Sequence, residues 1–141
     1  MRIFMDETAW LALANADDPL HLLMKNEFQN FLEGGNRFYS SNIMIGNVIS
    51  GIKDMQGTAK ASGFYNIVEE ARLGTHLHIL WIGRRTMKDA FRLFNKFPDL
   101  QLSIWDFANI VLMNRRNIRF IMTANTAYSE MGFKIVPENK G

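Results

Sequence analysis

The sequence predicts a three-layer α/β/α domain built on a mostly parallel central sheet of about five strands. Short apolar runs, typical of buried strands, alternate along the 141 residues with longer segments whose apolar residues recur at helical spacing. This alternation favours a parallel sheet with helices on both faces. Because no repeat, low-complexity block or Pro/Ser-rich linker divides the chain, we interpret residues 1–141 as a single domain.

Five apolar runs are the expected strands. They cover Ile3–Met5, Phe38–Tyr39, Leu77–Ile82, Ile118–Met122 and Lys134–Val136. In parallel sheets covered by helices, the functional site lies beyond the carboxyl ends of the strands. Asp6 and Asn125 both stand just past such an end, and Asp106 opens a helix, so these side chains are expected to meet at one edge of the sheet.

Helices are expected between the strands. Thr8 is the expected N-cap of the first, His21–Leu32 forms the second, and Ser41 or Asn42 caps the third. The next segments are Ala59–Arg72, Arg84–Phe97, an almost wholly apolar Ser103–Arg116, and a short Thr126–Met131. Helical spacing predicts that these side chains point inward: Ile45, Val48, Ile49, Ile52, Met55, Phe64, Ile67, Val68, Met87, Ala90, Phe91, Phe94 and Phe97.

Composition and charge narrow the range of functions. Lys and Arg number 16 against 14 Asp and Glu, a formal net charge of +2, so nucleic-acid binding would have to come from local patches. The lack of cysteine excludes a disulfide framework, a thiolate nucleophile and Cys-ligated zinc. No signal peptide and no run of about 18 apolar residues is present, so we expect a soluble, cytoplasmic protein without a membrane span.

Four segments place polar residues where strands end or helices begin. They are Met5–Leu13 with Asp6 and Thr8, Ser40–Val48 with Asn47, Leu102–Ala108 with Asp106, and Thr123–Tyr128 with Asn125 and Ala127. In this order and at this spacing they resemble the PIN-domain proteins, especially the small VapC toxins of toxin–antitoxin pairs. The resemblance covers nearly the whole chain. It implies a PIN-like α/β/α fold.

PIN-domain proteins with a full set of acids bind Mg²⁺ or Mn²⁺ and hydrolyse RNA with an activated water. The resemblance implies catalytic positions at Asp6, Asn47, Asp106 and Asn125, metal ligands at Asp6 and Asp106, and supporting roles for Thr8 and Thr123. The acidic set is incomplete here, because Asn47, Asn125 and Ala127 stand where acids are usual. Loss of one carboxylate ~5 Å from a divalent ion removes about 6 kcal/mol of attraction. Glu7 would compensate only if its side chain turned toward Asp6, and we expect it to point away.

The expected function is therefore that of a nucleic-acid-acting protein of metal-dependent ribonuclease lineage whose catalysis is weakened. RNA, an antitoxin protein and a second copy of the chain are the expected partners, with Mg²⁺ or Mn²⁺ weakly bound if the protein is active. The second helix carries more apolar residues than one narrow inward stripe needs, which favours a homodimer. These residues are Leu20, Leu23, Met24 and Phe31. The alternative is a non-catalytic module that binds RNA or a protein through the surface that carries the catalytic positions in PIN-domain proteins.

Three weaker patterns have two interpretations each. Four arginines are candidate nucleic-acid contacts, although arginines at helix ends commonly complement the helix dipole. They are Arg84, Arg85, Arg115 and Arg116. His76 and His78 lie on one side of a strand and form either a metal pair or, more simply, a surface pair. Trp10 and Trp105 lie near the retained aspartates and either stack a base or pack in the core.

Overall fold

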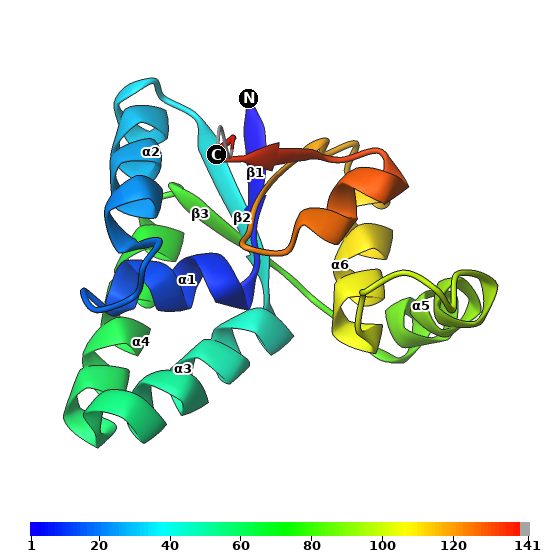
Figure 1. Ribbon diagram of the computed structural model, residues 1–141. Coiled ribbons are helices and arrows are strands. Elements are labelled where there is room, and N and C mark those ends of the chain that lie inside the picture. The colour runs from blue at the N-terminus through cyan, green and yellow to red at the C-terminus, as the bar shows by residue number, and fades with distance from the viewer. Residues whose placement is uncertain (139–141) are drawn as a thin grey trace.

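Five parallel strands form the sheet of the protein, whose computed structural model describes residues 1–138 (Figure 1). The strands lie in the order β3-β2-β1-β4-β5. Their bounds are β1 (Arg2–Met5), β2 (Arg37–Ser41), β3 (Leu77–Leu80), β4 (Phe120–Met122) and β5 (Lys134–Val136). The expected parallel sheet of five strands is confirmed, and each strand begins and ends within two residues of the prediction.

Helices cover both faces of this sheet. The helices α1 (Glu7–Ala14), α2 (His21–Glu33), α3 (Asn42–Gln56) and α4 (Thr58–Leu73) lie on one side, and α5 (Arg84–Lys96) and α6 (Ile104–Arg115) lie on the other (Figure 1). A short 3₁₀ helix, η1 (Thr126–Met131), joins β4 to β5. The three-layer α/β/α architecture expected from the sequence is therefore confirmed.

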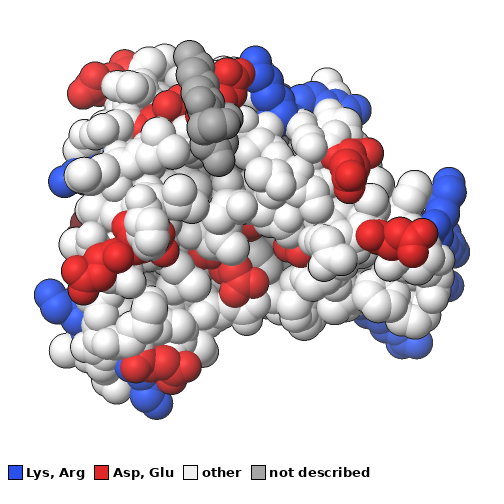
Figure 2. Space-filling view, viewed as in Figure 1, with Lys and Arg blue, Asp and Glu red and all other residues white. Residues whose placement is uncertain are grey.

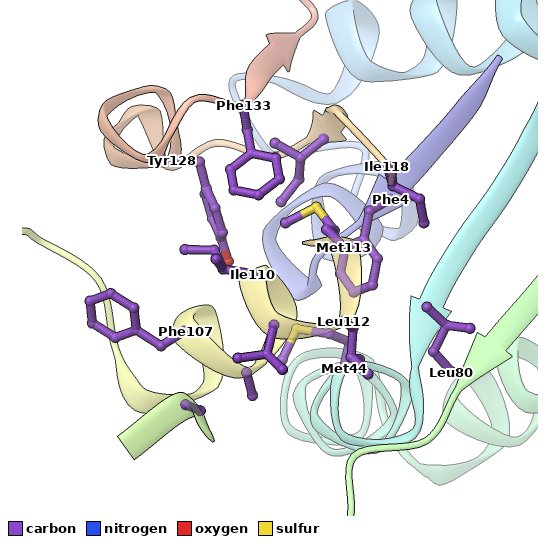
Figure 3. Packing of buried hydrophobic residues seen from close by; sticks show 14 of the residues in the cluster. Phe4, Met44, Leu80, Phe107, Ile110, Leu112, Met113, Ile118, Tyr128 and Phe133 are labelled. Atoms are coloured by element: carbon purple, nitrogen blue, oxygen red, sulfur yellow. The ribbon is translucent and has the colours of Figure 1, made fainter. Parts of the chain in front are cut away.

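Two apolar cores lie on opposite faces of the sheet, because successive strand side chains point to opposite sides. In β1, Ile3 and Met5 pack with α1 and α4, whereas Phe4 packs against α6. Figure 3 shows the core on the α6 side of the sheet, where Tyr128 and Phe133 pack in the same cluster as Phe4 and Met113. The start of α1 and the start of α6 thus approach the sheet from opposite faces.

The inward stripe predicted for α5 is wrong at two positions. Phe91 is 58% exposed and Phe94 is 42% exposed, whereas Thr86 and Ala90 are buried. The reason is that α5 packs against α6 and lies at the margin of the molecule, so only a narrow strip of its surface is covered. The inward positions predicted for Met55 and Ile67 are also wrong, because both side chains are exposed. Met55 lies in the last turn of α3, and Ile67 borders an open apolar hollow beside Trp10 and Phe28.

Candidate active site at the carboxyl edge of the sheet

Polar side chains meet where the parallel strands end. Asp6 follows β1, Ser41 is the last residue of β2, and Thr123 follows β4. Because the strands are all parallel, these ends lie at one edge of the sheet. Asp106 reaches the same region from the first turn of α6, and the charges of Asp6 and Asp106 act on each other.

Asp6 is buried at this edge, with only 2% of its surface exposed. It is the N-cap of α1, and its Oδ1 accepts hydrogen bonds from the Ala9 amide at 3.1 Å and from the Thr8 hydroxyl at 2.6 Å. Its Oδ2 accepts one from the Thr123 hydroxyl. Burial raises the pKa of Asp6 to about 6 despite these lowering hydrogen bonds, and the negative charge of Asp106 adds to the rise.

Thr8 and Thr123 connect Asp6 to the loop after β4. The Thr8 hydroxyl accepts a hydrogen bond from the Ala124 amide at 2.8 Å, and the Thr123 hydroxyl accepts one from the Asn125 amide at 2.9 Å. Each hydroxyl therefore donates to the carboxylate and accepts from the backbone. The prediction that Thr8 caps α1 is wrong, because the helix begins at Glu7, which places Asp6 at the N-cap and Thr8 within the first turn.

Asp106 is held by two hydrogen bonds. Its Oδ2 accepts from the Ser103 amide at 2.8 Å in a capping box, and its Oδ1 accepts from the Tyr128 hydroxyl at 2.7 Å. The Tyr128 hydroxyl in turn accepts from Nδ2 of Asn109 at 3.2 Å. Burial, together with the nearby aspartates, holds the pKa of Tyr128 well above its ordinary value.

The roles of Tyr128 and Asn109 were not foreseen from the sequence. The signal was present, however, because Asn109 is the one amide in the otherwise apolar stretch from Phe107 to Met113. A buried amide needs hydrogen-bond partners, which makes such a residue informative in a buried helix. Asn109 is wholly buried.

Glu7 lies near enough to Asp106 for the two charges to act on each other. Burial and the charge of Asp106 raise the pKa of Glu7, while a hydrogen bond with the Asn47 side chain lowers it. Asp6 has extended backbone angles (φ −88°, ψ 178°), and Glu7 is already the first helical residue. Asp6, Glu7 and Asp106 are called the acidic centre below.

Asn47 and Asn125 differ in what their side chains contact. Asn47, on α3, reaches Glu7 and so borders the acidic centre. Asn125 caps η1, because its Oδ1 accepts from the Ala127 amide at 3.0 Å and its Nδ2 donates to the Gln101 carbonyl at 3.1 Å. The Asn125 amide therefore joins two loops, and its hydrogen bonds do not go to the acidic centre.

The acidic centre has the donor chemistry of a hard divalent cation but few free ligands. Figure 2 shows acidic atoms in the middle of the face between α1 and α6, with lysines and arginines toward the margins. Oxygen ligands suit Mg²⁺ and Mn²⁺. Three of the roughly four acceptor positions of Asp6 already receive hydrogen bonds. Among residues 1–138, no three His, Asp or Glu side chains are grouped so that they hold a metal ion.

The four arginines lie away from the acidic centre. Arg115 lies nine residues, or roughly 13 Å of helix, beyond Asp106. It forms an ion pair with Asp89 at 2.6 Å and donates to the Thr86 hydroxyl at 2.8 Å, which places the start of α5, with Arg84 and Arg85, near that end of α6. Arg116 caps α6 and is exposed.

His78, Trp10 and Trp105 pack against other parts of the fold. His78 stacks on Tyr39 with ring centroids 4.9 Å apart. Trp10 is buried, donates to the Ser40 hydroxyl at 3.3 Å and packs against Phe28 and Phe64. Trp105 is half-buried beside the core on the α6 side. The core interpretation of Trp10 is therefore confirmed.

Known structures share this arrangement of strands and helices. No protein-family model matches the sequence, and no curated protein sequence matches it. The structure of Mycobacterium tuberculosis VapC20, described as a toxin that cleaves the sarcin–ricin loop, superposes with a TM-score of 0.81 over 94% of this chain and 96% of that one, at 20% identity. The chain has a PIN-like, VapC-like fold.

A second VapC-like structure agrees. VapBC2 from Rickettsia felis, solved with a DNA fragment from its promoter, gives a TM-score of 0.70 at 12% identity and covers 96% of this chain and 97% of that one. At these identities the comparison establishes the VapC-like fold, and the activity is argued separately. No helix within the described part of the VapC-like chain is long and apolar enough to cross a membrane.

Proposed function

We propose that the protein acts on RNA as a VapC-like protein of metal-dependent ribonuclease lineage whose metal centre is weakened. One observation carries the proposal: on a VapC-like fold, the charges of Asp6 and Asp106 act on each other near the carboxyl edge of the sheet, and the neutral Asn47 contacts the neighbouring Glu7. The likeness to a toxin that cleaves the sarcin–ricin loop supports RNA as the substrate class.

Asp6 and Asp106 would hold the Mg²⁺ or Mn²⁺ ion, with Glu7 supplying a third negative charge nearby. When bound, such an ion polarises a water for attack on a phosphodiester. Because the Asp6 and Asp106 carboxylates already accept several hydrogen bonds, binding in the millimolar range is expected.

The surrounding residues fix these carboxylates in place. Thr8 and Thr123 hold Asp6 through both of its oxygens. Tyr128 and the Ser103 amide hold Asp106 in the same way. Positioning of this kind lowers the cost of organising ligands around an ion, since the carboxylates do not have to be ordered on binding.

The expected partners follow from the same likeness. VapBC2 is a two-component assembly bound to promoter DNA, which supports an antitoxin protein as a partner of this chain. A homodimer in the cytoplasm is also part of the proposal. Of the four residues that suggested a dimer, Met24 is buried and Leu23 is exposed, and Leu22 adds a second exposed apolar side chain on α2.

Cleavage of labelled RNA tests the proposal. The wild type with Mn²⁺ is expected to cleave single-stranded RNA slowly, EDTA is expected to abolish cleavage, and Asp106→Asn is expected to abolish it too. Asp17→Asn, a change at an exposed loop residue, is the matched control and is expected to cleave like the wild type. RNA binding without any metal-dependent cleavage would contradict the proposal and favour the alternative of a non-catalytic RNA- or protein-binding module.

A further inference from the structure

The net positive charge of the protein is concentrated on one helix. The 13 residues of α5 contain five cationic side chains and one anionic side chain, a formal charge of +4. Because the whole chain carries +2, the other 128 residues have a net charge of −2. The field near α5 is therefore opposite in sign to that of the rest of the molecule, including the acidic centre.

Aromatic rings are exposed among these cations. Phe91 and Phe94 are 58% and 42% exposed, and their nearly parallel rings (13° between planes) have centroids 5.9 Å apart. Trp81, 74% exposed, lies three residues before Arg84, and its indole contacts the backbone at Gly83 so closely that an added Cβ there would lie 3.3 Å from the ring. Exposed rings of this size are unusual on an otherwise polar surface.

Two of the cations and one of the rings form a row along α5. Arg84, Lys88 and Phe91 follow one another at helical spacings of four and three residues, so they form a single row. Arg84, Arg85, Lys88 and Phe91 also line one shallow hollow. Among residues 1–138, no carboxylate lies within ion-pair distance of Arg84, Arg85 or Lys88. The α5 surface is defined here as Trp81, Arg84, Arg85, Lys88, Phe91 and Phe94.

We propose that the α5 surface binds single-stranded RNA, with bases stacked on Phe91, Phe94 and Trp81 and phosphates at Arg84, Arg85 and Lys88. This combination of exposed ring faces and free cations suits single strands, whose bases are unstacked and whose backbone is uniformly negative. The inference takes RNA from the proposed function and adds a docking surface apart from the acidic centre. Arg115 contacts Thr86 of α5 and lies roughly 13 Å along α6 from Asp106. An RNA strand bound to the α5 surface would therefore need only a few more nucleotides to extend to the acidic centre.

Other occupants fit the α5 surface less well. An interfacial membrane helix needs a continuous apolar face, whereas the row that contains Phe91 also contains Arg84, Lys88 and Asn95. The remaining apolar residues, Met87, Ala90 and Leu93, pack toward α6. An acidic protein would pair with the cations but would leave the ring faces without a matched partner.

Fluorescence anisotropy with a labelled single-stranded RNA of about twelve nucleotides tests the inference. The titration is done in EDTA, so that neither a metal ion nor cleavage contributes. Phe91→Leu is expected to weaken binding at least fivefold, since Leu keeps apolar bulk but offers no ring face, and Phe91→Trp is expected to bind like the wild type. Lys88→Ala is expected to lower the slope of log K against log salt by about 0.7.

Matched controls come from α4, where Tyr65 and Lys60 are exposed on the opposite side of the sheet. Tyr65→Leu and Lys60→Ala are expected to leave the RNA affinity unchanged. The inference is overturned if Phe91→Leu binds RNA like the wild type, if Tyr65→Leu weakens binding equally, or if polyglutamate or anionic phosphatidylserine vesicles bind as tightly as RNA in the same buffer.

The inference and the proposed function fail separately. Ring-dependent RNA binding in EDTA, with no cleavage in Mn²⁺, would support the α5 surface and contradict the proposed function. Metal-dependent cleavage by the wild type, with an unchanged RNA affinity in Phe91→Leu, would support the proposed function and contradict RNA binding at the α5 surface.

Discussion

The hydroxyl of Tyr128 donates a hydrogen bond of 2.7 Å to Oδ1 of Asp106. This contact joins η1 to the first turn of α6, and it continues to Asn109, whose Nδ2 donates to Tyr128 at 3.2 Å. Tyr128 and Asn109 are wholly buried. The carboxylate at the acidic centre is therefore held by a polar network that is part of the core, which means that changes in this network should alter stability as well as the site.

Removing the Tyr128 hydroxyl should destabilise the protein. Tyr128→Phe leaves Asn109 without its oxygen partner in the core, and a buried unsatisfied amide costs about 1–3 kcal/mol. The double change Tyr128→Phe with Asn109→Leu removes both polar groups and is expected to recover most of that loss. Urea denaturation gives the free energies of unfolding, and additive losses in the double variant would contradict the network.

The pH dependence of stability should report on Asp6. Its pKa is raised from 3.8 to about 6 on folding, so the folded state holds the proton more tightly than the unfolded state. The contribution of Asp6 to the free energy of unfolding is fully present below pH 3.8. It is lost as the pH rises through 6, and the loss amounts to about 3 kcal/mol. Asp6→Asn cannot ionise. The free energy of unfolding of Asp6→Asn minus that of the wild type is therefore expected to increase between pH 4 and pH 7.

The matched control for that experiment is Asp17→Asn, because Asp17 is exposed. Its difference from the wild type is expected to stay constant across the same pH range. If the Asp6→Asn difference stayed constant or fell with rising pH, Asp6 would not be a buried carboxyl of raised pKa.

Restoring acids should have different effects at positions 47 and 125. Asn47→Glu adds a charge beside Glu7, and the repulsion between these carboxylates is relieved when a cation binds, so Mn²⁺ affinity should rise about tenfold or more. Asn125→Asp keeps the cap on Ala127 but loses the donor to the Gln101 carbonyl, so its gain should be smaller. Calorimetric titration with Mn²⁺ measures both, with Asn26→Glu on the exposed side of α2 as the control. Equal gains in all three variants would point to a nonspecific charge effect.

Oligomeric state is a further test. Leu22 and Leu23 are both exposed on α2. If they form part of a homodimer interface, sedimentation at tens of micromolar should give a species of about twice 16.3 kDa. Leu22→Glu should shift it to the monomer, because it places a charge in the apolar contact, and a monomeric wild type would contradict the dimer.

The fold could be predicted from the sequence because periodicity specifies it well. The apolar runs around Ile3 and Ile121 alternate with helical segments, and the structure places them as neighbouring parallel strands. The faces of marginal helices were predicted less well. Phe91 and Phe94 follow helical spacing, but spacing alone does not show how much of a helix its neighbours cover. In α5, only Thr86 and Ala90 are fully buried.

Some residues of the site could be predicted from the sequence and others could not. Asp6 and Asp106 were predicted from their positions at a strand end and a helix start, and the structure brings their charges within range of each other. The position of Glu7 relative to Asp6 depends on where the strand ends and the helix begins, to within one residue, and sequence patterns do not fix that boundary. The contact of Tyr128 with Asp106 links residues 22 positions apart, so it needed the tertiary structure.

Calorimetric titration of the wild type and Asp6→Asn with Mg²⁺ and Mn²⁺ tests the central claim most directly. A centre that retains Asp6 and Asp106 but has neutral Asn47 beside it should bind Mn²⁺ in the millimolar range, and Asp6→Asn should abolish that binding. Micromolar binding of Mg²⁺ by the wild type would contradict a weakened centre, and binding unchanged in Asp6→Asn would show that the ion is held elsewhere.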